Sequence, residues 1–296
     1  MLSVTGFSSK RSTIRIFVVL ALVVLLAALA AGSAFAAGGP RPWEINFQPP
    51  ATPVAQRLDA FWDELLIIIF AIGTLVLVLL VIVMVRFNHR RHPVPARTAH
   101  NSLIEVIWTV VPVLILVIIA IPSFKLMFYM NNIKHPQMVV KVTGHQWYWT
   151  YNYPTEGKLS FNSTMVPNDK LKPGQPRFLT AKHPLVVPVD TNIRVLVTST
   201  DVIHSWFVPS FGVQEYAVPG RTNHAWFRVL RPGTYYGQCN QLCGVDHALM
   251  PIEIKALSKP AFARWLAGAK KEFAEGGMHG ATIDLASAGG QGGIAP

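Results

Sequence analysis

Two cysteines, the only ones in the chain, lie in a short segment that also holds a histidine and a methionine. Cys239, Cys243, His247 and Met250 follow the spacing C-x3-C-x3-H-x2-M, and His204 lies upstream, where a predicted strand ends. Thiolate, imidazole and thioether groups together are the soft ligands that suit copper. An iron–sulfur cluster usually needs four cysteines and is excluded on count. The pattern therefore predicts a copper site.

The second thiolate bears on how many copper ions such a site holds. One cysteine, two histidines and an axial methionine are enough for a mononuclear blue-copper site. Two thiolates can bridge two copper ions, which then share a transferred electron and change their bond lengths little on reduction. Such a centre relays electrons and leaves no open position for a substrate. The alternative is a structural disulfide between Cys239 and Cys243, which an exported domain allows.

Residues 1–36 have the pattern of a secretory signal peptide. Lys10, Arg11 and Arg15 precede an apolar run over residues 16–30, and a small-x-small pattern ends at Ala36, where we expect cleavage. The alternative is an uncleaved membrane helix. Residues 37–64 are then predicted to form an extracytoplasmic segment.

Two apolar runs, residues 65–85 and 106–130, are each long enough to cross a bilayer as a helix. The loop between them, residues 86–105, carries Arg86, Arg90, Arg91 and Arg97 and no acid before Glu105. The positive-inside rule places this loop in the cytoplasm and everything after residue 130 outside. We therefore predict a transmembrane hairpin over residues 65–130, in contact with lipid in a bacterial inner membrane, with the metal-binding domain on the periplasmic side.

Beyond the hairpin, the pattern changes to short alternating segments separated by turn-forming residues. About seven strands between residues 137 and 257 predict a sandwich or Greek-key barrel. In the aromatic segment 145–153, alternation would place His145, Trp147, Trp149, Tyr151 and Tyr153 on one face. A short helix is expected over residues 259–275, then a flexible Gly/Ala-rich tail over residues 276–296. The net charge of +11 forms no basic stripe interleaved with aromatic residues, which argues against a nucleic-acid partner.

Taken together, these motifs resemble subunit II of the haem–copper cytochrome c oxidases. The resemblance covers residues 47–266 and is carried by the hairpin, by residues 144–149, 201–206, 219–221 and 235–239, and by the cysteine segment. It implies an all-β, cupredoxin-like Greek-key barrel over residues 131–258, behind an N-terminal two-helix transmembrane hairpin. It also implies a dinuclear copper A centre, whose ligands would be His204, Cys239, the backbone carbonyl of Gln241, Cys243, His247 and Met250.

The same resemblance implies a function within a complex. Electrons would arrive singly from a c-type cytochrome, enter through Trp147, reach the copper pair and pass to a haem in oxidase subunit I. Haem is expected only in that partner, where oxygen is reduced to water and protons are pumped; a subunit III is also expected. Glu105 matches the glutamate at the mouth of a proton-uptake path, although from the residues alone it reads as a carboxylate at a helix N-terminus.

The chain departs from the family pattern at two places. The family usually has a glutamate between the cysteines, whose side chain reaches a magnesium or manganese ion shared with subunit I. Gln241 keeps the backbone oxygen for copper, but its neutral amide is a poorer ligand for a hard cation, which puts the second metal site in question. The acids usual near the entry tryptophan are also scarce, which predicts weak electrostatic steering or a less basic donor. The charged residues that follow the aromatic strand include Glu156, Lys158, Lys170, Lys172 and Lys182, and Thr200 precedes Asp201.

Three other functions share some of these features. A quinol oxidase subunit II resembles this chain in hairpin and barrel but lacks the copper ligands. The copper A domain of a nitrous oxide reductase shares the cysteine segment, but a resemblance to that enzyme would imply a soluble chain without this hairpin. A membrane-anchored copper-delivery chaperone or thiol oxidoreductase would have its histidine far downstream of the cysteines, whereas His204 lies upstream. No motif gives this chain a complete active site of its own, so we expect its activity to belong to a complex.

Overall fold

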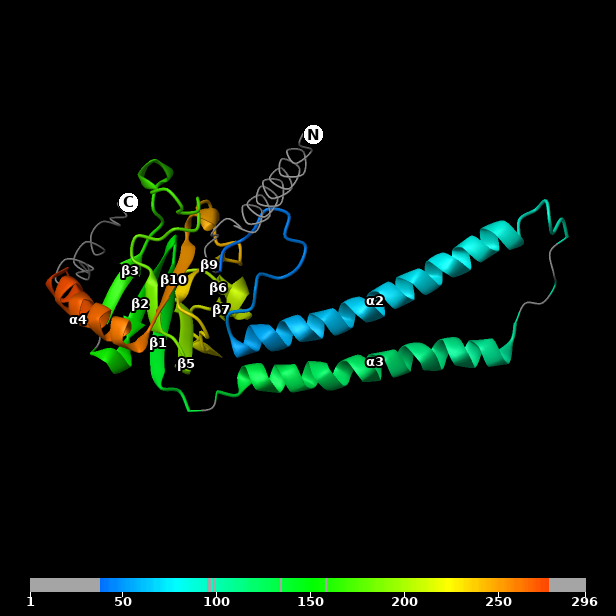
Figure 1. Cartoon of the computed structure of the whole chain (residues 1–296), viewed down its shortest axis with the longest axis horizontal. Helices are drawn as coiled ribbons and strands as arrows, with labels where there is room; N and C mark the ends of the chain where they lie inside the picture. The colour runs from blue at the N-terminus through cyan, green and yellow to red at the C-terminus, as the bar shows by residue number, and fades with distance from the viewer. Residues whose placement is uncertain (1–37, 95–96, 98–99, 134, 158, 277–296) are drawn as a thin grey trace, which may run out of the picture. The chain divides into compact units, whose positions relative to one another are not determined.

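The computed structural model describes residues 38–94, 97, 100–133, 135–157 and 159–276. The predicted signal peptide, and all of the predicted tail except Gly276, lie outside the described residues. The described residues belong to one compact unit that begins at Gly38. Figure 1 shows its two kinds of structure, a pair of long helices and a domain of β-strands.

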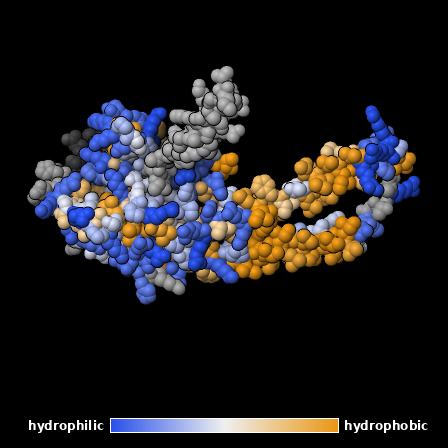
Figure 2. Space-filling model, in the orientation of Figure 1, coloured by the Kyte–Doolittle hydropathy of each residue, from blue (hydrophilic) through white to orange (hydrophobic). Residues whose placement is uncertain are grey.

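The two long helices are α2 (Pro53–Arg86) and α3 (Ser102–Asn131). Both contain the apolar runs predicted to span the membrane, and α2 begins well before residue 65. Their side chains are mostly apolar and exposed (Figure 2), as expected of helices that face hydrocarbon. Pro112 and Pro122 lie inside α3 without ending it. Both helices are long and apolar enough to cross a membrane, in agreement with the prediction.

Side-chain caps define where both helices begin. Thr52 caps α2 and donates its hydroxyl to the carbonyl of Phe211 at 2.7 Å, which ties the start of α2 to the β-domain. Asn101 caps α3 by accepting the backbone N–H of Ile104 at 3.2 Å. The Glu105 carboxylate in turn accepts the backbone N–H of Asn101 at 3.1 Å. This reciprocal pair satisfies two N–H groups that a helix start otherwise leaves unpaired.

The β-domain consists of two five-stranded sheets. One has the order β3-β2-β1-β5-β8 and the other β4-β10-β9-β6-β7. The pairs β1–β5 and β4–β10 are parallel and the other pairs antiparallel. The strands are β1 (Met138–His145), β2 (Tyr148–Tyr153), β3 (Leu159–Ser163), β4 (Leu185–Pro188), β5 (Ile193–Ser199), β6 (His204–Val208), β7 (Val213–Ala217), β8 (Asn223–Phe227), β9 (Gly233–Cys239) and β10 (Pro251–Leu257).

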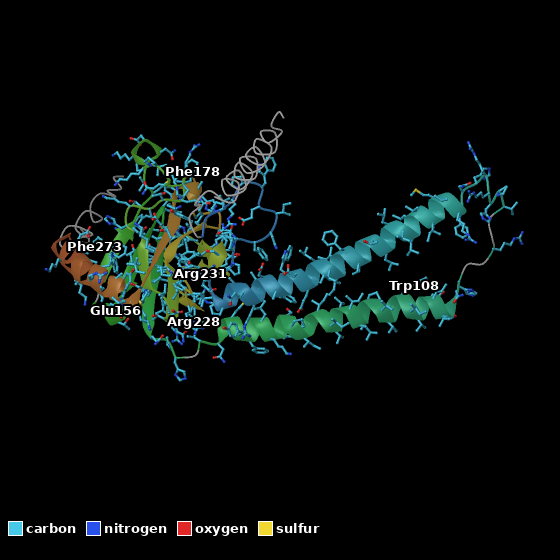
Figure 3. The ribbon with its side chains drawn as sticks, in the orientation of Figure 1. Trp108, Glu156, Phe178, Arg228, Arg231 and Phe273 are labelled. Carbon is cyan, nitrogen blue, oxygen red and sulfur yellow. The ribbon has the colours of Figure 1, made fainter. Side chains whose placement is uncertain are left out.

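The core lies between the sheets and is built from alternating residues. In β5, Ile193, Val195 and Val197 are fully buried while the residues between them are not. The last helix, α4 (Lys259–Gly276), packs on β3 and β4. Its Phe273, labelled in Figure 3, stacks on Phe161 with ring centroids 4.7 Å apart. The predicted all-β domain behind two membrane helices is confirmed.

The aromatic segment differs from the single strand expected over residues 145–153. The chain turns at Gln146 and Trp147, so that β1 and β2 form a hairpin in which His145 faces Tyr148 across the two strands. Trp149, Tyr151 and Tyr153 are fully buried, as predicted for a core face. His145, the last residue of β1, pairs with Tyr148 and so lies on the face opposite Trp149, while Trp147 lies in the turn and is partly buried against the core.

Candidate metal centre

The candidate ligands come together where two neighbouring strands meet one loop. Cys239 ends β9, Cys243 lies in the loop that follows, and His247 opens the short 3-10 helix η4 (His247–Leu249). Met250 connects η4 to β10. His204 is the first residue of β6, which pairs with β9; the expectation that it ends a strand was wrong. The register of β6 and β9 brings the upstream histidine to the cysteine loop.

Distances within this cluster are those of a site for soft metal ions. The Sγ atoms of Cys239 and Cys243 lie 3.9 Å apart, and both cysteines are free and buried. Cys243 Sγ lies 3.4 Å from His247 Nδ1 and 3.6 Å from Met250 Sδ. The ligand atoms of His204, Cys239 and Cys243 are all within 4.8 Å of one another. Five side chains with sulfur and nitrogen donors therefore lie around the pair of cysteine sulfur atoms.

The carbonyl predicted as the remaining ligand also faces the cluster. The thiol of Cys239 donates to the backbone carbonyl of Gln241 at 3.3 Å. This oxygen is held in place by the loop and does not depend on the side chain at position 241. The structure thus brings together every ligand predicted from the sequence.

His204 provides the observation that best tests whether these residues fit a metal. The side chain is fully buried, and its Nε2 lies 2.9 Å from Oδ1 of Asp201. Its Nδ1 is buried without a hydrogen-bond partner among the described residues. A buried nitrogen without a partner is costly unless it binds something, and a carboxylate on the other nitrogen is the usual support of a metal-binding imidazole. The donor set therefore fits copper.

The charges around the cluster favour a bound cation. Burial would raise the pKa of Cys239, but the neighbouring imidazole of His204 stabilises its thiolate, and the net shift is downward. Burial and the adjacent Cys239 thiolate together raise the pKa of Cys243 to about 12. Burial works against Asp201 as well, yet hydrogen bonds from His204 and two backbone N–H groups lower its pKa to about 2. Two adjacent thiolates become stable together only when a cation lies between them.

Trp147, predicted as the entry point for electrons, lies directly against the cysteine loop. Its Nε1 donates to the carbonyl of Cys243 at 3.3 Å, and Gln146 Nε2 donates to the same oxygen at 2.8 Å. Gly244 allows this approach, because a Cβ there would lie 2.9 Å from the Trp147 ring. The roles of Gln146, Gly244 and Asp201 were not predicted. The sequence signals for Asp201 are its place three residues before His204 and its position in the segment 201–206 that carries the family resemblance.

Glu105 is not part of this cluster. It lies in the first turn of α3, at the opposite end of that helix from Asn131 and the β-domain that follows, and its observed contact is the cap described above. Glu105 therefore has the structural role that the residues alone suggested, that of a carboxylate at a helix N-terminus. No observed contact concerns a proton path.

Comparison with known proteins gives matches over both parts of the chain. The model of the cytochrome c oxidase subunit II periplasmic domain matches residues 138–257, and that of the transmembrane domain matches residues 40–126. The probable cytochrome c oxidase subunit 2 of Rickettsia bellii is 47% identical, covering 86% of this chain and 95% of its own. Cytochrome c oxidase subunit 2 of Oenothera berteroana is 45% identical, and the match covers 76% of this chain and 90% of that protein.

A solved structure is also similar. The crystal structure of the periplasmic domain of subunit II of cytochrome oxidase (CoxB) of Bradyrhizobium japonicum is 47% identical, with a TM-score of 0.46. The match covers 48% of this chain and 99% of that chain.

The family models together span the helix pair and the β-domain, and the relatives match along most of their own length. The β-domain is therefore cupredoxin-like, and the protein is anchored in a membrane with this domain on the periplasmic side. Its enzymatic activity is that of an oxidoreductase complex of which it is one subunit. The chain belongs to the cytochrome c oxidase subunit II family.

Proposed function

We propose that this chain is the electron-entry subunit of a proton-pumping cytochrome c oxidase in a bacterial inner membrane. It accepts electrons from a c-type cytochrome at a dinuclear copper A centre and passes them to haem in subunit I, where oxygen is reduced to water. The partners are subunit I, a subunit III and the surrounding lipid. The observation that carries this proposal is that two thiols, two imidazoles and a thioether lie together, while His204 Nδ1 is buried without a hydrogen-bond partner among the described residues.

In this proposal, His204, Cys239, the carbonyl of Gln241, Cys243, His247 and Met250 hold two copper ions. Bound copper would supply a one-electron relay whose charge is shared by both metals. The protein limits movement of the ligands. His204 begins β6, Cys239 ends the neighbouring strand β9, and Asp201 holds the His204 imidazole through Nε2. Burial of both thiols excludes water from the cluster.

Trp147 is the proposed entry point for electrons. Its indole is partly buried and its Nε1–H hydrogen bond ends on Cys243, so a donor docked over the indole would be one hydrogen bond from a ligand residue. Gln146 Nε2 donates to the same carbonyl and so supports this arrangement.

The contacts in the cluster weigh against the alternative functions. A disulfide between Cys239 and Cys243 would leave His247 and Met250 beside the sulfur atoms without a purpose. A quinol-oxidising subunit would have no use for five converging soft donors. A thiol oxidoreductase needs an accessible cysteine, whereas both cysteines here are buried.

Two further roles follow from the resemblance alone. Glu105 is proposed as an entry point for protons on the cytoplasmic side, in addition to capping α3. A magnesium or manganese ion shared with subunit I is not proposed, because Gln241 offers such an ion only a neutral amide at this place.

The test is copper analysis and electron paramagnetic resonance of the full chain in its purified complex. Two copper ions per chain, with hyperfine splitting from two equivalent nuclei, are expected. One copper ion per chain, or the splitting of a single nucleus, would reject the proposal. Exchanging Met250 for Leu, which keeps the volume of the buried side chain, should alter that spectrum, because Met250 Sδ lies 3.6 Å from Cys243 Sγ.

A further inference from the structure

The sheet topology brings two arginines to the end of the β-domain that faces the membrane. β1 begins shortly after α3 ends, and β5 runs parallel to it, so Arg194 near the start of β5 lies at that end. β8 runs antiparallel to β5 and finishes there, with Trp226 opposite Arg194. Arg228 (Figure 3) shares the outward face with Trp226, because Phe227 and Val229 belong to the core. Both arginines are therefore neighbours of one indole on this face.

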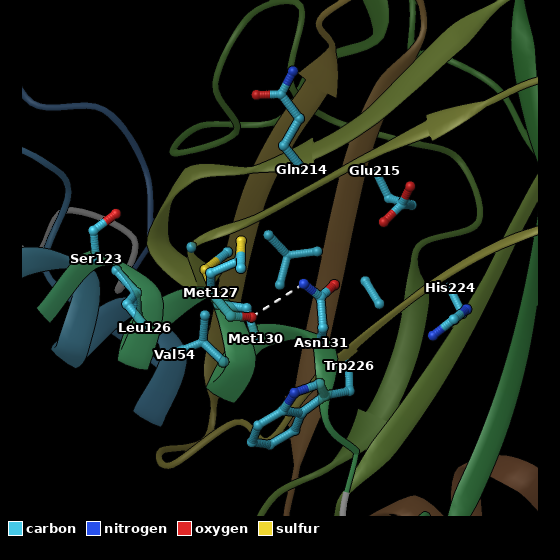
Figure 4. Close-up of a pocket in the computed structure, with 13 residues that line it drawn as sticks. Val54, Ser123, Leu126, Met127, Met130, Asn131, Gln214, Glu215, His224 and Trp226 are labelled. Carbon is cyan, nitrogen blue, oxygen red and sulfur yellow. Dashed lines mark hydrogen bonds between the residues drawn. The ribbon is translucent and has the colours of Figure 1, made fainter. Parts of the chain in front are cut away.

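The membrane helices add a third arginine. The ring of Tyr129, in the last turn of α3, packs against Trp226 with centroids 5.5 Å apart, and Trp226 Nε1 donates to the Tyr129 carbonyl at 3.3 Å. Figure 4 shows this indole beside the end of α3. The guanidinium of Arg57, near the start of α2, lies over the Tyr129 ring, 3.7 Å from its centroid. Arg57, Arg194 and Arg228 therefore form an arginine cluster around one pair of aromatic rings.

The arginine cluster has no acidic partner in the part of the chain that the structure describes. No carboxylate oxygen there lies within 4.0 Å of its guanidinium nitrogens, including that of Glu215 in the cavity that Trp226 also lines (Figure 4). The Nε atoms of Arg194 and Arg228 are buried without a hydrogen-bond partner among the described residues. Buried donors are costly when unpaired, and guanidinium groups bind phosphate and carboxylate oxygens most strongly. The cluster therefore fits an anion.

The depth of the cluster in the membrane indicates the source of that anion. Arg57 and Tyr129 lie where two helices long enough to span a bilayer adjoin the periplasmic domain, at the level of the lipid headgroups. Tyrosine and tryptophan rings are enriched at this level. Lys125, one turn before Tyr129 on α3, is exposed and adds a positive charge, and Phe128 beside them is 68% exposed. A phospholipid supplies both a phosphate for these cations and acyl chains for the apolar helix surface, whereas inorganic phosphate or an acidic side chain supplies only charge.

We propose that the arginine cluster binds the headgroup phosphate of an anionic phospholipid in the periplasmic leaflet, with the acyl chains along the exposed face of α3. Each guanidinium presents a planar fork of N–H groups that matches phosphate oxygens, and the Nε–H groups of Arg194 and Arg228 gain acceptors. The bound phosphate connects α2 with β5 and β8 and so holds the β-domain against the membrane. The site requires only the membrane anchoring of this chain and is independent of the copper ligands and of electron transfer.

The first test uses the intact purified oxidase in phosphatidylcholine nanodiscs that contain a photoactivatable phosphatidylglycerol. Mass spectrometry should find adducts in the peptides that carry the end of α3 and residues 223–231. A photoactivatable phosphatidylcholine should label these peptides at least about fivefold less, because its own cation offsets the phosphate. Excess inorganic phosphate should leave the labelling unchanged. Equal labelling by both lipids, no labelling, or displacement by inorganic phosphate would overturn the proposal.

The second test removes the positive charges one at a time. Arg228→Gln should lower the labelling by phosphatidylglycerol about fivefold, and Arg228→Lys, which keeps the charge, should lower it less. Arg264→Gln, at an exposed arginine of α4 outside the cluster, should label like the wild type. Unchanged labelling in Arg228→Gln would refute the inference. Arg57→Gln, at an exposed helix position, gives the same test where Arg228→Gln fails to accumulate. An unchanged copper spectrum in these samples would separate loss of lipid from a failure of the copper proposal.

Discussion

At the scale of single residues, Asp201 connects the fold to the metal ligands. Its carboxylate accepts the backbone N–H of Gln146 at 2.7 Å and that of Val202 at 2.6 Å, and it lies 2.9 Å from His204 Nε2. It therefore determines which nitrogen of His204 faces the sulfur atoms. Partners of metal-binding histidines commonly contribute 10- to 100-fold to metal affinity.

We expect Asp201→Asn to weaken copper retention by about tenfold, because an amide holds the imidazole less firmly than a carboxylate. The measurement is the copper content of the purified complex after titration with a copper chelator. Asp169→Asn, at an exposed position in a surface turn, is the matched control and should retain copper like the wild type. Equal retention in both variants would show that Asp201 does not position the ligand.

Gly244 determines how closely Trp147 approaches the cysteine loop. Its φ is +125°, and an added Cβ would meet the Trp147 ring at 2.9 Å and Gln146 Nε2 at 3.1 Å. We expect Gly244→Ala to move the indole away from Cys243 and to slow electron entry from cytochrome c by about tenfold or more, with the copper spectrum retained. Stopped-flow oxidation of reduced cytochrome c measures this rate.

Gly174→Ala is the control for that experiment. Gly174 also has a positive φ, of +85°, but nothing lies within 4 Å of an added Cβ. It should reproduce the backbone strain of the substitution without moving Trp147. A rate loss of the same size in both variants would attribute the effect to strain, and the proposed positioning role would be wrong.

At the scale of secondary-structure elements, the length of the apolar runs predicted the two helices, and the alternation of apolar and polar residues predicted the strands of the β-domain. Each of these signals lies within one segment of the sequence. The cysteine loop could be predicted for the same reason, because four of its ligands are close in sequence. The turn at Gln146 and Trp147 was missed because alternation continues through it without glycine, proline, asparagine or aspartate. The contacts of Gln146 and Trp147 with Cys243 join residues nearly a hundred positions apart, and no local pattern reports them.

A buried glutamate in β10 makes the stability of the β-domain depend on pH. Glu253 is 4% exposed, accepts the backbone N–H of Ala181 at 2.8 Å, and lies 3.8 Å from Lys255 Nζ. Burial raises its pKa above the ordinary 4.5, and the contacts with Ala181 and Lys255 offset only part of that effect. The folded state therefore binds this proton more tightly than the unfolded state, so the stability that Glu253 contributes is full below about pH 4.5 and is lost as pH rises through the folded pKa.

We accordingly expect Glu253→Gln to raise the free energy of unfolding at pH 7 by about 1 kcal/mol, since the amide oxygen still accepts the Ala181 N–H without a buried charge. The gain should shrink as the pH falls toward 4.5, where the wild-type carboxyl becomes protonated. Urea unfolding of both chains across this range measures the difference. A gain that stays constant with pH, or a loss at pH 7, would contradict the assignment.

At the scale of the whole molecule, the proposed donor-binding surface beside Trp147 carries exposed apolar side chains on a positively charged chain. After residue 130 the chain has 16 lysines and arginines against 10 aspartates and glutamates, a net charge of +6, and Lys170 and Lys172 are exposed. The cysteine loop beside Trp147 presents Leu242 and Val245, which are 76% and 93% exposed. A surface of this kind offers a basic cytochrome little long-range attraction, so we expect binding to depend on apolar contact at short range.

Oxidation of a basic cytochrome c should therefore depend only mildly on ionic strength. We expect kcat/KM to fall by about threefold or less between about 0.05 and about 0.2 M salt, because little long-range attraction is present for the salt to screen. Replacing Lys172 with Glu should raise kcat/KM at low salt, with no change in the copper spectrum, and this gain should disappear at high salt. A steep loss in the wild type, of more than about tenfold, would mean that a strongly charged docking surface exists and that apolar contact is not the main source of affinity.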